Sequence, residues 1–211
     1  MDLELRSYPL LECRMDTVDG HPVLVGHAAV FNQWSVVIPW GGPRGQFRER
    51  ILPGAFDRTL DAKPDVKLKV DHTGLPLART VSGTLALTPD DIGLGIRAPL
   101  DERDPDVLRI IPKIERGDLR HMSFAFYVPE GGDEWSLNAE VDERTLRDIE
   151  LDNGDVSVVG DPAYPATDVA FRSLTRYLAA AESRGEDHDA AEAQGRLDVL
   201  RRRLALVEIT L

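Results

Sequence analysis

Residues 119–128 read LRHMSFAFYV, and this stretch decides how the chain is expected to fold. Its aromatic and apolar residues favour a β-strand. Side chains alternate between the two faces of a strand, so Met122 and Phe124 are expected on an apolar face and Ser123 on the opposite one. His121 precedes Ser123 by two residues and should share its face, roughly 6–7 Å along the strand.

Strand patterns also lie on both sides of this stretch. Residues 66–70 alternate between valine or leucine and lysine, which predicts a half-buried strand whose apolar face His72 continues. Asp19-Gly20 suits a tight turn, so residues 23–31 should form the returning strand of a hairpin. Asn153-Gly154 suits the same kind of turn and predicts a second hairpin, in which 144–151 pairs with 155–159.

Two short helices are expected between the strands. Pro53 suits a first helical turn, and Phe56 and Leu60 lie one turn apart, which predicts a helix over 53–60. Asp104 is a suitable N-cap for a second helix over 106–116, which Gly117 should end. Many short strands with few helices predict a mainly β fold, an antiparallel barrel or sandwich.

Composition narrows the functional classes. The 211 residues include 25 Lys and Arg against 37 Asp and Glu, a net charge of −12, so nucleic acid is not expected as the main ligand. The single cysteine, Cys13, allows no intrachain disulfide or thiolate zinc site, as expected in a reducing cytosol. Neither a standard export signal nor a membrane-spanning stretch is recognisable, so no membrane partner is expected.

The composition changes near residue 172. Residues 173–183 have helical composition, 184–195 are polar and mostly acidic, and 196–211 begin with a short basic and apolar helix pattern. We therefore expect a β domain over 1–172 and a helical, partly flexible tail over 173–211.

The candidate chemistry is that of a serine hydroxyl beside an imidazole. Ser123 would be held on a rigid strand, and His72 and His121 are the histidines that could act as its base. A carboxylate of Glu150, Asp152 or Asp155 could orient the imidazole, as in a catalytic triad. From pattern alone, the chain is a β-rich domain that could be a serine hydrolase.

Motifs that recur in a fixed order add a family resemblance. They are GHAAVF (26–31), FRERILPGAF (47–56), VDH (70–72), DIGL (91–94), the segment 114–118 leading to MSFAF (122–126), DVSVV (155–159) and PAYP (162–165). In this order, over about residues 20–172, they resemble the prohead proteases of tailed phages, serine peptidases that mature the capsid.

The resemblance implies a role for each candidate residue. His72 corresponds to the general base and Ser123 to the nucleophile, while the third, acidic position falls on Asp155, where many relatives have Glu. Glu150 stays an alternative to Asp155, and His121 has no assigned family role. The resemblance also implies a barrel like that of herpesvirus assemblin. Acyl transfer further requires oxyanion donors, which we expect among the backbone amides of the loop 160–163.

The implied function is serine endopeptidase activity without a cofactor or metal. The expected substrates are the scaffolding part of the major capsid protein and the chain itself, which could also form a homo-oligomer, inside the assembling prohead in the host cytoplasm. Self-cleavage is expected in 184–195, and 196–211 would first dock into the shell. The alternatives are a non-catalytic assembly factor on the same barrel and a small-ligand β-barrel.

Overall fold

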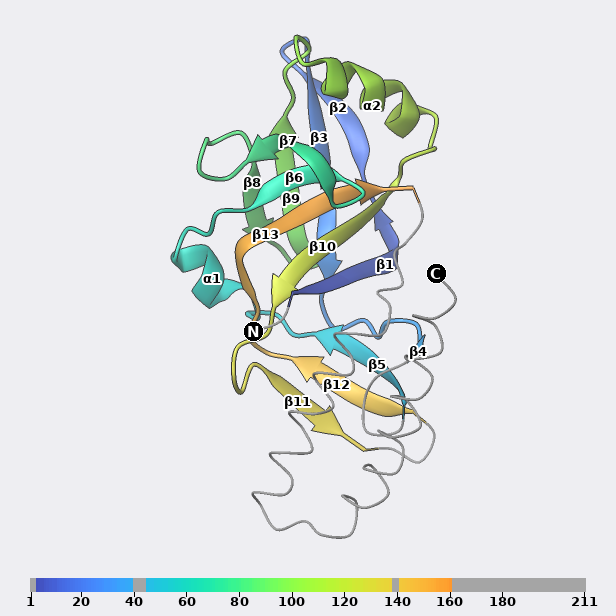
Figure 1. Ribbon diagram of the computed structural model, residues 1–211, viewed down its shortest axis with the longest axis vertical. Coiled ribbons are helices and arrows are strands. Elements are labelled where there is room, and N and C mark those ends of the chain that lie inside the picture. The colour runs from blue at the N-terminus through green and yellow to red at the C-terminus, as the bar shows by residue number, and fades with distance from the viewer. Residues whose placement is uncertain (1–2, 40–44, 138–140, 161–211) are drawn as a thin grey trace, which may run out of the picture.

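The computed structural model describes residues 3–39, 45–137 and 141–160 (Figure 1). In these residues β-strands predominate, accompanied by two short helices, α1 (Asp57–Asp61) and α2 (Pro105–Glu115). The strands are β1 (Glu4–Glu12), β2 (Arg14–Val18), β3 (His21–Val30), β4 (Ile38–Pro39), β5 (Gln46–Ile51), β6 (Lys67–Val70), β7 (Thr73–Arg79), β8 (Ala86–Pro89), β9 (Gly93–Pro99), β10 (His121–Tyr127), β11 (Asp133–Ser136), β12 (Asp142–Leu146) and β13 (Glu150–Val159).

The strands form three sheets. Their orders are β1-β10-β13-β6-β7, β2-β3-β9-β8 and β11-β12-β5-β4. The mainly β prediction is confirmed, but the closed antiparallel barrel is not observed, because none of these sheets closes on itself within the described residues. Two pairs, β13 with β6 and β12 with β5, are parallel, since long crossovers rather than tight hairpins connect these strands.

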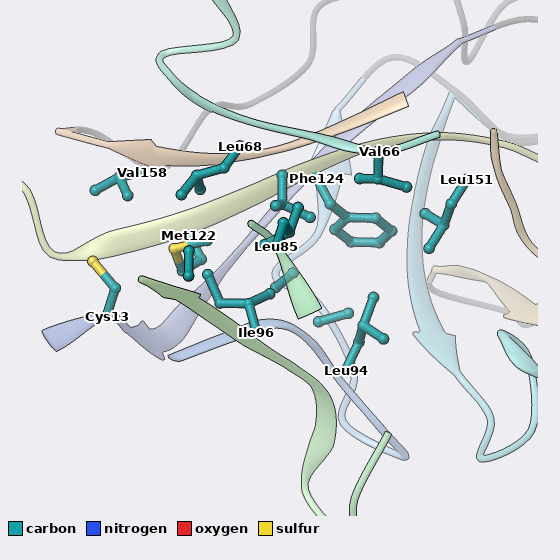
Figure 2. Close-up of a cluster of buried hydrophobic side chains, with 14 of the residues drawn as sticks. Cys13, Val66, Leu68, Leu85, Leu94, Ile96, Met122, Phe124, Leu151 and Val158 are labelled. Atoms are coloured by element: carbon teal, nitrogen blue, oxygen red, sulfur yellow. The ribbon is translucent and has the colours of Figure 1, made fainter. Parts of the chain in front are cut away.

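The hydrophobic core lies between the first two of these sheets (Figure 2). The five-stranded sheet contributes Leu68, Met122, Phe124 and Val158, and β9 contributes Leu94 and Ile96, among other residues. Met122 and Phe124 are both fully buried, which confirms the predicted apolar face of β10. Cys13 also lies in this core as a free thiol.

One predicted hairpin is confirmed and the other is wrong. β2 and β3 pair around Asp19-Gly20, where both residues have positive φ (52° and 82°). Asn153-Gly154, in contrast, lies inside β13, which runs on through it. The positive φ of Asn153, 61°, occurs where the pairing of β13 with β10 is irregular, and not in a turn between two strands.

Of the two predicted helices, the second is confirmed and the first is shorter than expected. The Asp104 side chain accepts a hydrogen bond from the Asp106 amide at 2.8 Å and caps α2, and Gly117 follows its end with φ 81°. Residues 53–56 form a turn before α1, because Gly54 adopts φ 86° and the Ala55 amide donates to the Leu52 carbonyl.

The predicted domain boundary between residues 172 and 173 lies outside the described residues, as does the predicted helical tail over 173–211. Neither helix in the described part of the chain is long and apolar enough to cross a membrane.

The close approach of β13 to β10 gives a stability prediction. A Cβ on Gly154 would lie 2.3 Å from the Ala125 carbonyl oxygen, so Gly154→Ala should force the two strands apart and lower the free energy of unfolding by about 1–3 kcal/mol. Gly160→Ala is the matched control, because its nearest contact would be an ordinary 3.7 Å. Chemical denaturation measures both variants, and equal stabilities would contradict the close approach.

Candidate active site

Ser123 lies in the middle of β10, on the face opposite the core. Its cross-strand partner on β13 is Ser157. Both serines are fully buried, while Met122 and Phe124 occupy the other face of β10. The alternation of side chains along β10 therefore turns the Ser123 hydroxyl toward a polar layer on the outer side of the sheet.

His72 follows β6, but not as a continuation of its apolar face. Asp71 and His72 both have left-handed φ values, 48° and 56°, so the chain turns sharply where the sequence predicted an extended face. Two hydrogen bonds hold this turn against β13, from the Asp71 amide to the Val158 carbonyl (3.0 Å) and from the His72 amide to Ser157 Oγ (3.1 Å). The surrounding sheet thus maintains an unfavourable backbone conformation that directs the imidazole.

The side chains of Ser123, His72 and Asp155 form a continuous hydrogen-bonded series. His72 Nε2 lies 2.7 Å from Ser123 Oγ, and His72 Nδ1 lies 2.6 Å from Asp155 Oδ1. They come from three neighbouring segments, β10, the turn after β6, and β13. The structure therefore brings together the three residues to which the resemblance gave roles.

Asp155 is held as a carboxylate. Burial alone would raise its pKa, but hydrogen bonds from His72 and Ser157, with Lys69 nearby, outweigh burial and lower the pKa below its ordinary value. Ser157 Oγ donates to Asp155 Oδ1 at 2.8 Å, and Lys69 Nζ lies 3.8 Å from Oδ2. The ionised group can accept a hydrogen bond from Nδ1–H, which favours the tautomer in which Nε2 is free to accept a proton.

Glu150, the alternative carboxylate, belongs to another network. Its oxygens accept hydrogen bonds from Thr59 Oγ1 (2.6 Å) and the Asp152 amide (2.9 Å), and its Oε2 pairs with Arg58 at 2.8 Å. Burial disfavours the charge of Glu150, but these contacts lower its pKa to about 2. Its environment is that of a structural ion pair.

His121 begins β10, where its Nε2 accepts a hydrogen bond from Arg120 Nε at 3.3 Å. Its Nδ1 is buried and has no hydrogen-bond partner. The hydrogen bonds of Ser123 Oγ are instead with His72 and with the main-chain carbonyl of Arg6, at 2.9 Å. Geometry thus places His72, and not His121, in contact with the serine.

Two features of this site were missed by the sequence analysis. Ser157 connects the His72 backbone to Asp155, and the signal for it was present in the alternation Asp155-Val156-Ser157, which puts both polar side chains on one strand face. The contact of Ser123 with the Arg6 carbonyl had no such signal in the sequence, because it depends on the pairing of β1 with β10.

The oxyanion loop expected over 160–163 lies mostly outside the described residues. Of its backbone amides, that of Gly160 is described, and it donates to Asp71 Oδ1 at 3.4 Å.

The remaining histidines on strands have ordinary partners. His27 Nε2 lies 2.8 Å from Asp90 Oδ2, and His21 Nδ1 lies 3.8 Å from Glu102. Among the described residues, no group of three or more His, Cys, Asp or Glu side chains could hold a metal ion.

A serine, a histidine and a carboxylate in hydrogen-bonded series on a rigid β scaffold are the arrangement used by serine hydrolases of several unrelated folds. Comparison with known families gives the more specific assignment. The chain belongs to the caudovirus prohead serine protease family, whose sequence model matches residues 10–180. Searches of curated proteins and of solved structures found no match.

The network around Glu150 predicts how stability depends on pH. Because its pKa is lowered from 4.5 to about 2, its stabilising effect should be complete above pH 4.5 and lost as the pH falls toward 2. Wild type should exceed Glu150→Gln in free energy of unfolding by on the order of 2 kcal/mol near pH 6, after allowing for partial solvent screening. Urea denaturation between pH 6 and pH 2 measures this difference, and a difference independent of pH would contradict the network.

Proposed function

We propose that this protein is a serine endopeptidase that cleaves the scaffolding part of the phage major capsid protein, and its own chain, during prohead maturation. The observation that carries the proposal is the hydrogen-bonded series from Asp155 through His72 to Ser123. Membership of the prohead serine protease family supports the choice of substrate and a location inside the assembling prohead.

In the first half of the proposed reaction, His72 Nε2 removes the proton from Ser123 Oγ as this oxygen attacks the scissile carbonyl carbon. The resulting imidazolium lies beside the Asp155 carboxylate, which stabilises its charge. The imidazolium then gives its proton to the leaving amine. The C–N bond breaks, and an ester links the acyl part of the substrate to Ser123.

In the second half, a water molecule takes the place of the leaving amine. His72 accepts a proton from this water, whose oxygen attacks the ester carbonyl, and then returns the proton to Ser123 Oγ as the acid is released. Ser157 supports both halves, because it fixes the orientation of Asp155 and the backbone of His72 at the same time. Such positioning contributes by holding the groups close to their reactive geometry.

A non-catalytic assembly factor is the second candidate, and one observation favours it. Ser123 is fully buried in this conformation, so a substrate cannot reach it unless something moves. Such a protein would bind the capsid precursor without cutting it.

Site variants separate the two candidates. Co-expression with the capsid precursor, followed by intact-mass analysis, should give processed capsid protein with wild type. Ser123→Ala and His72→Ala should lower the cleavage rate by roughly 10³-fold or more while the fold is retained. Asp155→Asn should lower it by about 10²–10⁴-fold, because an amide cannot hold the required tautomer in the same way.

Two matched controls accompany these variants. His121→Ala removes the other histidine near Ser123, and Glu150→Gln removes the other candidate carboxylate, and both should retain processing in proportion to their folded fraction. Normal processing by Ser123→Ala would remove Ser123 from the mechanism, whereas capsid protein left uncut by wild type would support the non-catalytic alternative. Loss of processing by His121→Ala alone would transfer the role of base to that residue.

Self-processing is tested on the purified protein. Mass spectrometry should find wild type shortened by a cut in 184–195 and Ser123→Ala full length. A tail that is intact in both would exclude self-processing, and a tail lost from both would indicate a host protease.

A further inference from the structure

The edge of β10 beside Ser123 is covered by the N-terminal strand of the same chain. Residues 4–7 of β1 pair antiparallel with β10, and Ser7 lies opposite Ser123. β1 is the outermost strand of its sheet (Figure 1), and its residues 4–9 precede the part of the chain that matches the protease family. An extended segment thus lies along the nucleophile where an edge strand can accept a peptide by β-augmentation.

The Arg6 carbonyl competes with His72 for the hydroxyl proton of Ser123. Ser123 Oγ donates to this carbonyl oxygen at 2.9 Å and also lies 2.7 Å from His72 Nε2, yet a hydroxyl has only one proton to donate. While the hydroxyl donates its hydrogen bond to the carbonyl, its proton does not point toward His72 Nε2. The carbonyl also presents its oxygen, not its carbon, to the nucleophile, which explains how the strand lies beside Ser123 without being cut.

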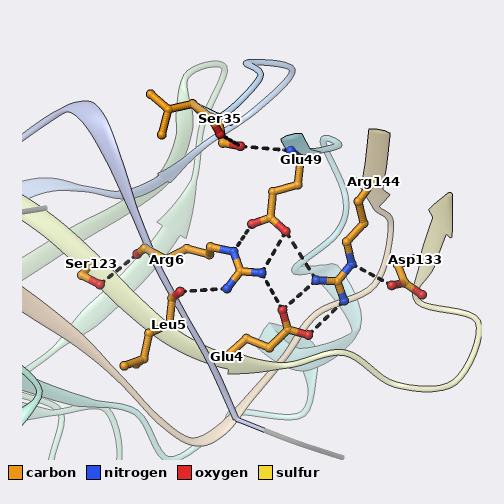
Figure 3. A network of polar contacts seen from close by, with 9 residues as sticks. Glu4, Leu5, Arg6, Ser35, Glu49, Ser123, Asp133 and Arg144 are labelled. Atoms are coloured by element: carbon orange, nitrogen blue, oxygen red, sulfur yellow. Dashed lines mark hydrogen bonds and ion pairs between the residues drawn. The ribbon is translucent and has the colours of Figure 1, made fainter. Parts of the chain in front are cut away.

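The side chain of Arg6 occupies a buried site that other parts of the chain build (Figure 3). Its guanidinium forms a two-pronged ion pair with Glu49, which is fully buried on β5. Phe47 and Phe126 flank the cation at 5.9 and 5.7 Å from the ring centres. Burial disfavours the charge on Arg6, but Glu49 and Glu4 outweigh it, and the pKa of Arg6 lies above its ordinary value.

The charges of this site define what can bind. Apart from β1, the network contains the carboxylates of Glu49 and Asp133 and one guanidinium, that of Arg144, and so carries one excess negative charge. β1 adds one cation, Arg6, which pairs with Glu49, and one carboxylate, that of Glu4, so the whole network keeps one excess negative charge. Glu4, two residues earlier on the same strand face, pairs with Arg144 through contacts of 2.6 and 2.9 Å.

We propose that this edge of β10 is the substrate groove of the protease, and that β1 occupies it in the resting state. The groove takes an extended peptide with arginine immediately before the scissile bond, bound by Glu49, and an acidic residue two positions earlier, bound by Arg144. This inference rests on the proposed peptidase function, because only an enzyme needs the groove emptied.

The structure shows where β1 can separate. The pairing of β1 with β10 is interrupted between Ser7 and Glu12, and beyond the interruption the Cys13 amide donates to the Arg120 carbonyl at 2.9 Å. Residues 4–7 can therefore leave the groove while the second attachment remains.

The sequence contains further segments of the required type. An acidic residue two positions before an arginine also occurs in residues 12–14, 101–103, 118–120 and 142–144, but residues 182–184 are the ones that reach the stretch where self-processing is expected. They read Glu-Ser-Arg, with the same spacing as Glu4-Leu5-Arg6, and Gly185 follows. The proposal therefore places self-cleavage at the bond between Arg184 and Gly185, at the start of the stretch where self-processing was expected.

Peptide binding tests the groove separately from catalysis. The full chain carrying Ser123→Ala is titrated into a fluorescein-labelled LELRSY peptide and a matched peptide with leucine in place of arginine, and anisotropy gives both affinities. Adding Arg6→Met, which keeps the packing stem but removes the cation, should tighten binding of the arginine peptide at least tenfold. The chain that carries both Ser123→Ala and Arg6→Met should bind the arginine peptide at least tenfold more tightly than the leucine peptide. A further Glu49→Gln should remove most of this difference in affinity.

Arg14→Met is the matched control, because Arg14 is exposed on β2 and should leave both affinities unchanged. Equal affinity of the Arg6→Met chain for the two peptides would overturn the groove, and so would a failure of Arg6→Met to tighten binding of the arginine peptide. Because Glu49→Gln could impair folding, the preference for the arginine peptide in the Arg6→Met background decides the matter alone.

Cleavage by the chain with Ser123 intact then separates the two proposals. Ser123-dependent cleavage with no preference for arginine overturns only the groove, whereas selective binding without any cleavage overturns only the peptidase function.

Discussion

The pairing of β13 with β10 on one side and with β6 on the other is the constraint on which the site depends. It aligns Ser157 with Ser123 and lets the turn after β6 carry His72 over the same face. A slip of one residue would turn Asp155 and Ser157 toward the core and bring valines to the site. The buried valines of β13, which pack with Met122 and Phe124, therefore select the register that the chemistry requires.

The sequence predicted those parts of the structure that depend on local pattern. The faces of β10, the β2–β3 hairpin and the cap of α2 all followed from periodicity or turn chemistry. Asn153-Gly154 misled because the same dipeptide serves a hairpin or a bulge. The close packing of the Gly154 backbone against β10, where an added Cβ would lie 2.3 Å from the Ala125 carbonyl oxygen, cannot be read from the sequence. Pattern alone also left Glu150, Asp152 and Asp155 equivalent, since the ion pair with Arg58 that occupies Glu150 joins residues 92 apart in the sequence. The family resemblance, not spacing, singled out Asp155.

The buried charges around Glu49 are difficult to explain as a device for stability alone. Removing several ions from water costs several kcal/mol each, and apolar residues of similar volume often serve as well or better. Arg144 and Glu49 nevertheless lie at 2% exposure or less, and the Arg144 guanidinium lies over the ring of Trp135. Buried charges do provide selectivity, because a bound residue of the wrong charge leaves a partner unpaired at high cost. A site that must choose one peptide among many gains from such a network.

An occupant that belongs to the same chain also sets the conditions under which the groove can open. A short tether gives β1 an effective concentration on the order of millimolar, so dilute peptides compete poorly with it. By this proposal, a substrate displaces β1 only where its own local concentration is comparable, and a protease enclosed in a shell assembled from its substrate would meet that condition. Confinement would then act as the signal for activation, because displacing the Arg6 carbonyl frees the Ser123 proton for His72. No separate activating factor is needed in such a scheme, since the same packing that presents the cleavage segments also drives β1 from the groove.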